Sequence, residues 1–399
     1  MGHSHSHSHS HSQSTRNDDD EKGALERKRT KVCVIAGATA IGKSSLGIAL
    51  ARALDGEVVS CDSVQIYQGL DVGSGKVSSG ERATTRHHAI DLVRDVRKEY
   101  DAVEYAKDAR AAIDEIASRG KVPIVVGGAG MYLRFLTDGA PSAPKSTAES
   151  KSNAKATMEA ARVKGGWREA CDVLRAAGDS VTPGKLSEND WYRLTRAYEI
   201  VVASGGRAVH EFAATPIDDA YDFRCFFLTA PRVELYRRID SRVEDMVCDG
   251  MLEEAAAMLN AGVRAGECSA SRAIGYRQSM EYLSLARAGE IEVNAETLLR
   301  FVDEAQQVTR AYAKRQYTWF RGEPEGRYLW IDASGDKDAL ARRVMDEFAR
   351  DEHAGGGEEM SELSKAEENE LKRYRAMLRR LNRTQTRDEL LDRIRTRLM

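Results

Sequence analysis

Residues 32–51 read VCVIAGATAIGKSSLGIALA and decide the fold, because they place a glycine-rich loop between an apolar strand and a helix. Gly37, Gly42, Lys43 and Ser44 satisfy the pattern G-x-x-x-x-G-K-[ST], in which backbone N–H groups curl around phosphate oxygens. Lys43 adds a point charge, and the Ser44 hydroxyl can hold Mg²⁺ at the start of the helix. The stretch therefore predicts a polyphosphate site, and a bound nucleotide such as ATP is the first expectation.

Further apolar stretches have the character of parallel strands buried on both faces. They read GEVVSCD (56–62), KVPIVVGG (121–128), DFRCFFLTAP (222–231) and RYLWIDA (327–333). Helical patterns alternate with them, and this alternation is typical of a parallel sheet in an α/β protein. The predicted fold class is an α/β P-loop sheet flanked by helices.

Changes in composition divide the chain. Residues 1–27 hold a His-Ser repeat and an acidic run typical of a tag and linker, and we exclude them from the fold. The predicted P-loop core comprises 28–140 and 207–340. Residues 141–206 are rich in Pro, Ser, Ala and Lys and then helical, so we predict an inserted helical subdomain. After the apparent linker HAGGGEE (353–359), residues 358–399 are predicted to form a C-terminal helical hairpin.

Composition narrows the classes of function. The net charge of −3 gives no global argument for nucleic-acid binding, which would need local basic patches. The six cysteines are scattered without metal-ligand spacing, so we expect neither disulfides nor a structural zinc site. No apolar run reaches the eighteen residues that a membrane helix needs, which favours a soluble protein with no membrane partner.

Asp62 ends the second predicted strand. The carboxyl ends of neighbouring parallel strands meet at the same edge of a sheet, so this carboxylate is expected beside the phosphate loop. It could bind Mg²⁺, orient a water or act as a general base there. The position of Asp62 is compatible with each of these roles. The alternative to a functional role is an ordinary solvent-exposed aspartate in a loop.

The residues after Asp62 form a more specific series, SCDSVQIYQGLDVGSGK (60–76). Together with the phosphate loop, this series resembles the tRNA dimethylallyltransferases, also called tRNA isopentenyltransferases. The resemblance runs from Val32 to about Asp332 and is closest to the plastid-type branch of plants and algae. Its other motifs are HHAIDL (87–92), PIVVGGAGMYL (123–133), NDWYRLTRAYEI (189–200), SRAIGYRQ (271–278) and YAKRQYTWFRG (312–322).

The resemblance implies a reaction. Members of the family move a dimethylallyl group from dimethylallyl diphosphate to the exocyclic amine of the adenine 3′ of the anticodon in tRNA. It implies that Gly37, Thr39, Gly42, Lys43 and Ser44 hold the diphosphate, with Mg²⁺ near Ser44, and that Asp62 is the general base. The resemblance also implies that the protein is a monomer that binds the anticodon stem-loop of tRNA. We expect it to be a soluble protein inside the cell. By its resemblance to the plastid-type branch it is expected in a plastid, and otherwise in the cytoplasm.

The helical stretch VELYRRIDSRVEDM (233–246) contains the arginine that the resemblance assigns to the diphosphate, Arg242. Arg238 and Arg242 are four residues apart, and such a like-charge pair disfavours a helix unless an anion joins the two side chains. Asp245 is the alternative anion, which would make the group an ordinary salt bridge.

Local basic and aromatic clusters are the candidates for tRNA contact, because arginines hold phosphates and aromatic rings stack on extruded bases. Ser63 and Gln65 are expected to bond the edge of the target adenine. The other candidate tRNA contacts are Tyr192, Arg193 and Arg196 in the insert, Arg272, Tyr276 and Arg277 in RAIGYR, and Lys314 and Arg315. A single patch of this kind is more often an ordinary solvated face of the protein. The basic run 372–383 is either a further contact or a solubilising face.

One departure from the family pattern concerns a predicted tRNA contact. The chain reads GGAG where most members read GGTG, so Ala129 lacks the hydroxyl expected to approach tRNA. One lost hydrogen bond costs about 0.5 to 1.5 kcal/mol and would slow the reaction without abolishing it. The alternatives to the tRNA enzyme are a small-molecule P-loop kinase, an adenylate isopentenyltransferase and a tRNA-binding module without catalysis.

Overall fold

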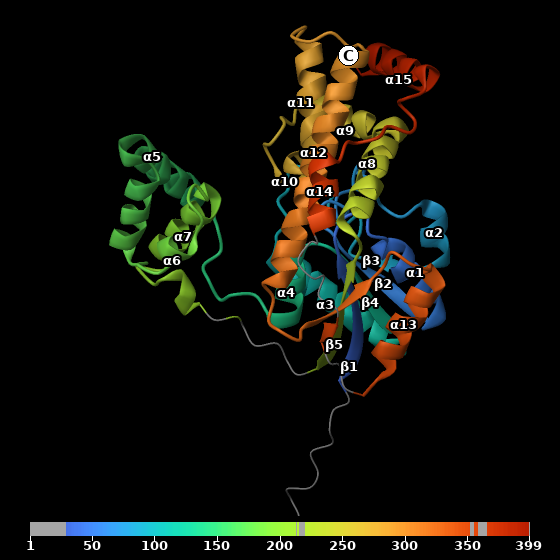
Figure 1. Ribbon diagram of the computed structural model, residues 1–399. Coiled ribbons are helices and arrows are strands. Elements are labelled where there is room, and N and C mark those ends of the chain that lie inside the picture. Colours follow the sequence, from blue (N-terminus) through green and yellow to red (C-terminus); the bar gives the residue numbers. More distant parts are fainter. Residues whose placement is uncertain (1–28, 213, 215–219, 352–354, 358–364, 399) are drawn as a thin grey trace, which may run out of the picture.

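The computed structural model describes residues 29–212, 214, 220–351, 355–357 and 365–398. Over these residues the chain forms one parallel sheet in the order β3-β2-β4-β1-β5-β6-β7 (Figure 1). The predicted P-loop sheet is confirmed. Its strands are β1 (Thr30–Gly37), β2 (Gly56–Cys61), β3 (His87–His88), β4 (Val122–Gly127), β5 (Tyr221–Thr229), β6 (Tyr328–Asp332) and β7 (Gly356–Gly357).

The central strand β1 is an unbroken apolar run because both of its faces are covered. Val32 to Ala36 are fully buried, between β4 on one side and β5 on the other. In the register, Ala36 lies beside Gly127 and Gly37 beside Leu228. The carboxyl ends of β1, β4 and β5 are therefore level, and the loops that follow them open on the same edge of the sheet.

Helices cover both faces of the sheet. The chain passes from β1 outward through α1 (Lys43–Ala53) to β2, and back through α3 (Ala102–Ser118) to β4, which lies between β1 and β2. Because parallel crossovers are right-handed, these opposite directions put α1 and α3 on opposite faces. The helix α13 (Lys337–Ala349) packs on α1, and α4 (Gly130–Asp138) packs on α3; the short α2 (Ser79–Thr84) precedes β3.

A helical unit between α4 and β5 buries a small core of its own. It contains α5 (Ala148–Ala177), α6 (Thr182–Lys185), α7 (Trp191–Ala203) and the 3₁₀ turn Val209–Glu211. Met158 and Leu174 of α5 pack there against Leu194 and Val201 of α7. In Figure 1 this unit stands apart from the sheet.

A second layer of helices extends beyond the carboxyl ends of the strands (Figure 1). It consists of α8 (Arg232–Asp249), α9 (Met251–Asn260), α10 (Ser269–Arg272), α11 (Tyr276–Arg287) and the long α12 (Ala295–Arg321). The helix α8 packs on α12, and α9 packs on α11. Among the described residues, no helix combines the length and apolar character needed to cross a membrane. All six cysteines are buried and free, as expected.

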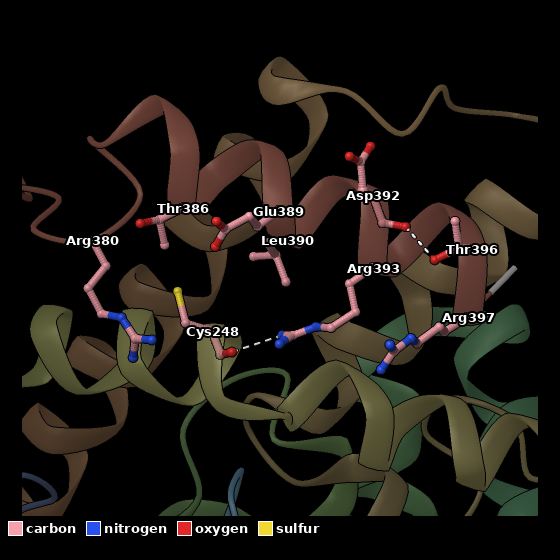
Figure 2. Close-up of a pocket in the computed structure, with 9 residues that line it drawn as sticks. All are labelled: Cys248, Arg380, Thr386, Glu389, Leu390, Asp392, Arg393, Thr396 and Arg397. Carbon is pink, nitrogen blue, oxygen red and sulfur yellow. Dashed lines mark hydrogen bonds between the residues drawn. The ribbon is translucent and has the colours of Figure 1, made fainter.

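The C-terminal helices α14 (Lys365–Arg373) and α15 (Thr384–Arg397) are built into this layer. Leu381, Leu390, Leu391, Ile394 and Leu398 are buried in the main core. The buried carboxylate of Glu244 on α8 accepts the backbone N–H groups of Arg379 (2.8 Å), Arg380 (2.8 Å) and Leu381 (2.6 Å). A pocket of about 410 Å³ remains between α15 and the end of α8 (Figure 2).

Two expectations about this region were wrong. Part of the predicted linker HAGGGEE is a strand, because Gly356 and Gly357 pair with Leu329 and Trp330 of β6. The basic run 372–383 is not a plain solvated face. Arg379 makes a two-pronged ion pair with Asp245 (2.9 and 2.8 Å), and Arg380 pairs with Asp249 (2.7 Å), so this segment forms ion pairs with two acidic residues of α8.

Candidate active site

The phosphate loop joins the end of β1 to the start of α1, and two of its glycines are required by its shape. Gly37 has φ +152°, and a side chain there would meet Ile41 and the Leu228 carbonyl at 3.1 Å. Gly42 is the N-cap of α1 with φ +108°, a left-handed conformation that favours glycine. The loop thus presents the free N–H groups of a helix N-terminus to the carboxyl edge of the sheet.

Lys43 is the first residue of α1 and is half-buried. Its Nζ donates to the Ala38 carbonyl (2.8 Å), within the loop itself. Burial, and after it the positive charge of Arg242, lowers the pKa of Lys43 to about 8. An anion bound in the loop would reverse both effects, so the position favours a negatively charged ligand.

Gln316 of α12 connects the phosphate loop to the residues after β4, and no sequence motif singles it out. Its buried side-chain amide accepts the Thr39 N–H (2.9 Å) and donates to the Gly128 carbonyl (3.0 Å). The Gln316 side chain therefore bridges the phosphate loop and the β4–α4 loop and holds them at a fixed separation. The amide lies between basic and aromatic residues in YAKRQYTWFRG, and only the fold shows that it points inward.

Asp62 follows β2 on the same edge of the sheet. Its Oδ1 accepts the backbone N–H groups of Val64 (2.8 Å) and Gln65 (3.3 Å), which fix the orientation of the carboxylate. Its negative charge raises the pKa of Lys43 and of Arg242, in each case against the larger effect of burial. The pKa of Tyr312 on α12 is raised by burial and then by the same charge. Asp62 therefore lies within electrostatic reach of all three groups.

Arg242 reaches this place from α8. Burial lowers the pKa of its guanidinium, and the charge of Asp62 opposes the shift. The backbone of Gly75 lies so close that a side chain there would overlap the guanidinium. Arg238 pairs with Glu234, one turn earlier in the helix. The alternative in which Asp245 joins the two arginines is wrong, because Asp245 bonds to Arg379 and Arg380.

Comparison with known proteins shows the family of this chain. A family model described as IPP transferase matches residues 65–323. A protein of Arabidopsis thaliana named tRNA dimethylallyltransferase 9 is 37% identical, over 92% of this chain and 87% of the plant protein. A tRNA dimethylallyltransferase of Anaeromyxobacter dehalogenans is 40% identical, over 79% of this chain and 99% of its own. This chain belongs to the IPP transferase family.

Solved structures of the family share the fold. The tRNA isopentenylpyrophosphate transferase of Bacillus halodurans has a TM-score of 0.56 and 28% identity, covering 80% of this chain and 95% of its own. A eukaryotic dimethylallyltransferase described as acting on tRNA has a TM-score of 0.58 and 25% identity, covering 80% of this chain and 79% of its own.

The residues expected to read the adenine lie on the loop after Asp62 in this IPP transferase. Ser63 is exposed beside Asp62. The Gln65 amide is occupied by its own loop, since it accepts the Ser60 hydroxyl (2.9 Å) and donates to the carbonyls of Ser74 (3.2 Å) and Gly75 (3.4 Å). Ser63 is thus the more accessible of the two.

The patch predicted in the insert is divided. Tyr192 is 81% exposed at the start of α7, and Arg193 beside it is exposed with a loose ion pair to Asp190 (3.4 Å). Arg196 is half-buried, pairs with Glu199 (2.7 Å) and donates to the Pro144 carbonyl (2.8 Å). Tyr192 and Arg193 remain a surface that a nucleic acid can meet, whereas Arg196 holds the insert together.

The patch predicted in RAIGYR is divided, because its tyrosine is buried whereas its two arginines are exposed and paired with acidic residues. Tyr276 is fully buried and donates its hydroxyl to Glu254 (2.5 Å), so its ring cannot stack on a base as predicted. Arg272 pairs with Glu99 (3.0 Å), and Arg277 pairs with Glu281 (2.8 Å).

The last predicted patch stays on the surface. Lys314 and Arg315 are exposed on α12, and the Arg315 guanidinium lies 5.8 Å from the ring of Tyr312, whose pKa is raised by burial and then by the charge of Asp62. Arg315 is therefore an exposed cation next to a residue that senses the charge of the candidate general base.

We expect diphosphate binding to weaken as the pH rises above about 8. Below this value free Lys43 is already protonated, and above it binding must take up a proton, which weakens binding by up to about tenfold per pH unit. Titration calorimetry with inorganic diphosphate across this range measures the effect. Lys43→Met is the control, since it should lose this component, and an identical slope in that variant would contradict the assignment.

Proposed function

We propose that this protein transfers a dimethylallyl group from dimethylallyl diphosphate to the exocyclic amine of the adenine 3′ of the anticodon in tRNA. The observation that carries the proposal is the position of Asp62. Its carboxylate lies within electrostatic reach of Lys43 and Arg242, so a base stands beside the cations that would hold a leaving diphosphate. The motifs shared with the family and the relatives that act on tRNA support the choice of substrate.

The phosphate loop and Arg242 bind the donor. We assign the diphosphate oxygens to the N–H groups of the loop up to Ser44, apart from the Thr39 N–H that donates to Gln316, with Lys43 and Arg242 as the flanking cations. When the allylic C–O bond breaks, its electron pair goes to the diphosphate, and these cations stabilise the charge that develops. The diphosphate leaves intact, so no nucleotide is hydrolysed.

Ser44 fits a magnesium ion that arrives with the diphosphate. It is exposed as the second residue of α1, and Mg²⁺ in such sites needs few protein ligands because phosphate oxygens and water supply the rest. Among the described residues, no cluster of three His, Cys, Asp or Glu side chains offers an alternative site. When bound, the ion would neutralise charge on the leaving group.

Asp62 serves the acceptor. An aryl amine is a weak nucleophile, and it must lose a proton as its nitrogen bonds to the allylic carbon. The two backbone N–H groups on Oδ1 hold the carboxylate in one orientation to receive that proton. The amine must reach a site below the surface, so the adenine has to leave its stack, and Ser63, Tyr192, Arg193, Lys314 and Arg315 are proposed to hold the RNA while it does.

The experiment that tests the function offers several acceptors. The protein is incubated with Mg²⁺ and radiolabelled dimethylallyl diphosphate, together with undermodified tRNA, AMP or ATP in separate reactions. We expect label only in tRNA. Faster labelling of AMP or ATP would favour the adenylate isopentenyltransferase alternative. If none of the acceptors were labelled, the protein would be a tRNA-binding module without catalysis. If it instead consumed ATP in the presence of a small molecule, the kinase alternative would hold.

All the proposed catalytic groups come from one chain, and we propose that the protein acts as a monomer. The groups belong to the phosphate loop, the end of β2, and the helices α8 and α12. A molecular mass near 44.1 kDa by light scattering at the concentration used for the assay would agree with this proposal. The plastid-type branch and the compartment stay predictions.

Restoring threonine at residue 129 is expected to help both folding and tRNA binding. Ala129 is the N-cap of α4 and has no side chain to cap the helix. A hydroxyl there should stabilise the fold by about 0.5 to 2 kcal/mol and add one hydrogen bond toward tRNA. Urea unfolding and the KM for tRNA measure the two effects. Ala129→Val is the control, because it adds similar bulk without the hydroxyl and should give neither gain.

A further inference from the structure

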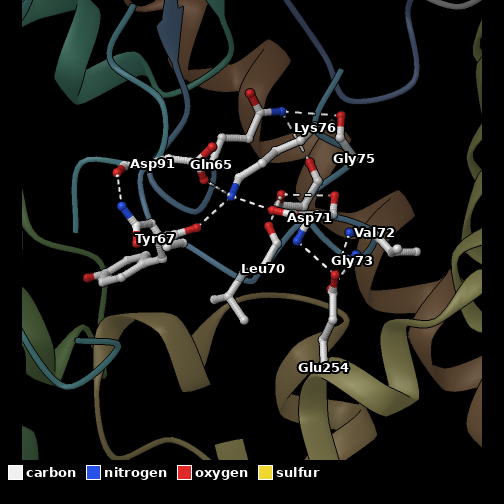
Figure 3. A network of polar contacts seen from close by, with 12 residues as sticks. Gln65, Tyr67, Leu70, Asp71, Val72, Gly73, Gly75, Lys76, Asp91 and Glu254 are labelled. Carbon is white, nitrogen blue, oxygen red and sulfur yellow. Dashed lines mark hydrogen bonds and ion pairs between the residues drawn. The ribbon is translucent and has the colours of Figure 1, made fainter. Parts of the chain in front are cut away.

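A single carboxylate organises the loop that lies between the candidate diphosphate and adenine sites. Oε1 of Glu254, on α9, accepts the backbone N–H groups of Asp71 (2.8 Å) and Val72 (2.7 Å). Its Oε2 accepts the Gly73 N–H (3.0 Å) and the Tyr276 hydroxyl (2.5 Å). Figure 3 shows the carboxylate aimed at this loop. Four donors on one carboxylate are the capacity of the group.

The other end of the loop is fixed by Lys76. The side chain of Lys76 is 1% exposed, and its Nζ donates to the Tyr67 carbonyl (2.6 Å) and to the carboxylates of Asp71 (2.7 Å) and Asp91 (2.5 Å). Residues 71–76 are therefore held at both ends (Figure 3). There is no room for the loop to settle further, since a side chain at Gly73 would overlap the ring of Tyr276.

This loop touches both halves of the candidate site. Gly75 lies against the guanidinium of Arg242. The carbonyls of Ser74 and Gly75 accept the Gln65 amide, and the Gln65 backbone N–H bonds to Asp62. A shift of residues 73–75 would therefore displace Arg242 on one side and the segment that orients Asp62 on the other.

We infer that Glu254 is a positioning residue, which sets the place of Arg242 and the orientation of Asp62 through the loop 71–76. The inference rests on the proposed function for the identity of the ligands. The effect of Glu254 on Arg242 can nevertheless be measured as a change in the Kd for inorganic diphosphate alone. A shift of about 1 Å in a group that positions the reacting parts can cost on the order of 100-fold in rate. Glu254 exerts this control without touching either substrate.

The test compares Glu254→Ala with Glu253→Ala. Glu253 is the neighbouring residue on α9 and pairs with Arg393 (2.7 Å), so its replacement removes the same charge from the same helix without touching the loop. In Glu254→Ala we expect the Kd for inorganic diphosphate and the KM for dimethylallyl diphosphate to rise about tenfold, and kcat to fall. Glu253→Ala should leave all three near those of the unmodified protein.

A third variant separates positioning from simple loss of stability. Glu254→Gln keeps one oxygen for the Asp71 and Val72 N–H groups but turns an amide nitrogen toward Gly73, so an intermediate Kd is expected. If Glu254→Ala lowered the melting temperature but left the Kd, KM and kcat of the folded protein unchanged, Glu254 would be merely structural. If no acceptor were ever prenylated, the function would fail, while the change in diphosphate Kd would still test Glu254.

Discussion

Replacing Asp62 by asparagine is expected to lower kcat for prenyl transfer by about 10²- to 10⁴-fold, the usual contribution of a general base. Asparagine keeps an oxygen for the Val64 and Gln65 N–H groups, so the local loop should keep its shape. It cannot accept the proton of the amine. The defect should therefore appear in kcat with tRNA saturating, measured by incorporation of labelled dimethylallyl groups.

The same variant should bind diphosphate at least as well as the unmodified protein at about pH 7, because a negative charge beside Lys43 and Arg242 has been removed. Asp55→Asn is the matched control. Asp55 precedes β2 whereas Asp62 follows it, and it is exposed at the opposite edge of the sheet with an ion pair to Lys121. An unchanged kcat in Asp62→Asn, or an equal loss in Asp55→Asn, would overturn the assignment of Asp62.

Replacing Ile394 or Leu391 by alanine is expected to destabilise the whole protein by about 2 to 5 kcal/mol each. Ile394 is fully buried and Leu391 is 4% exposed, in the same core as the sheet and α8. A typical domain has only about 5 to 15 kcal/mol of stability in total. Deletion of α15 removes these side chains together, and we expect the remaining chain to aggregate or to lack a cooperative unfolding transition.

Urea unfolding measures these losses, and Met377→Ala is the control from the same C-terminal segment. Met377 is 77% exposed, so its replacement should change the free energy of unfolding by less than about 0.5 kcal/mol. If Ile394→Ala were as mild as Met377→Ala, α15 would be an appendage after all. A hairpin that serves only to bind tRNA would instead affect the KM for tRNA and leave stability unchanged.

The parts of the fold that follow from local pattern could be predicted from the sequence. The run from Val32 to Ala36 needs two covered faces, and only a central parallel strand supplies them. Gly37, Gly42, Lys43 and Ser44 define their loop by spacing, and the place of Asp62 follows from the rule that parallel strands end at the same edge.

The parts that depend on distant partners could not be predicted in the same way. Gln316 and Glu254 have ordinary polar side chains in helices, and their roles appear only when the fold brings them to Thr39 and Gly73. Tyr276 looked like a base-stacking residue because aromatic and basic neighbours surround it in the sequence. In the structure its ring is buried, because the hydroxyl has a carboxylate partner that permits burial.

Charge was the least predictable signal. Arg272 lies beside Glu99, and Arg379 beside Asp245, across more than a hundred residues of chain in each case. A sequence shows the clustering of cations but not the anions that will face them. Ser63, Lys314, Arg315, Tyr192 and Arg193 are accessible predicted contacts, whereas the exposed Arg272 and Arg277 are paired with Glu99 and Glu281.

The anchoring of Glu244 by residues 379–381 has a consequence for how the protein is made. A ribosome synthesises the phosphate loop and the strand of Asp62 first, and the helix of Arg242 follows. That helix lacks the partners of Glu244, and the core lacks Leu391 and Ile394, until the last helix has left the ribosome. The nascent chain is therefore expected to be inactive and open to proteases up to that moment, so that active enzyme arises only from chains completed through α15.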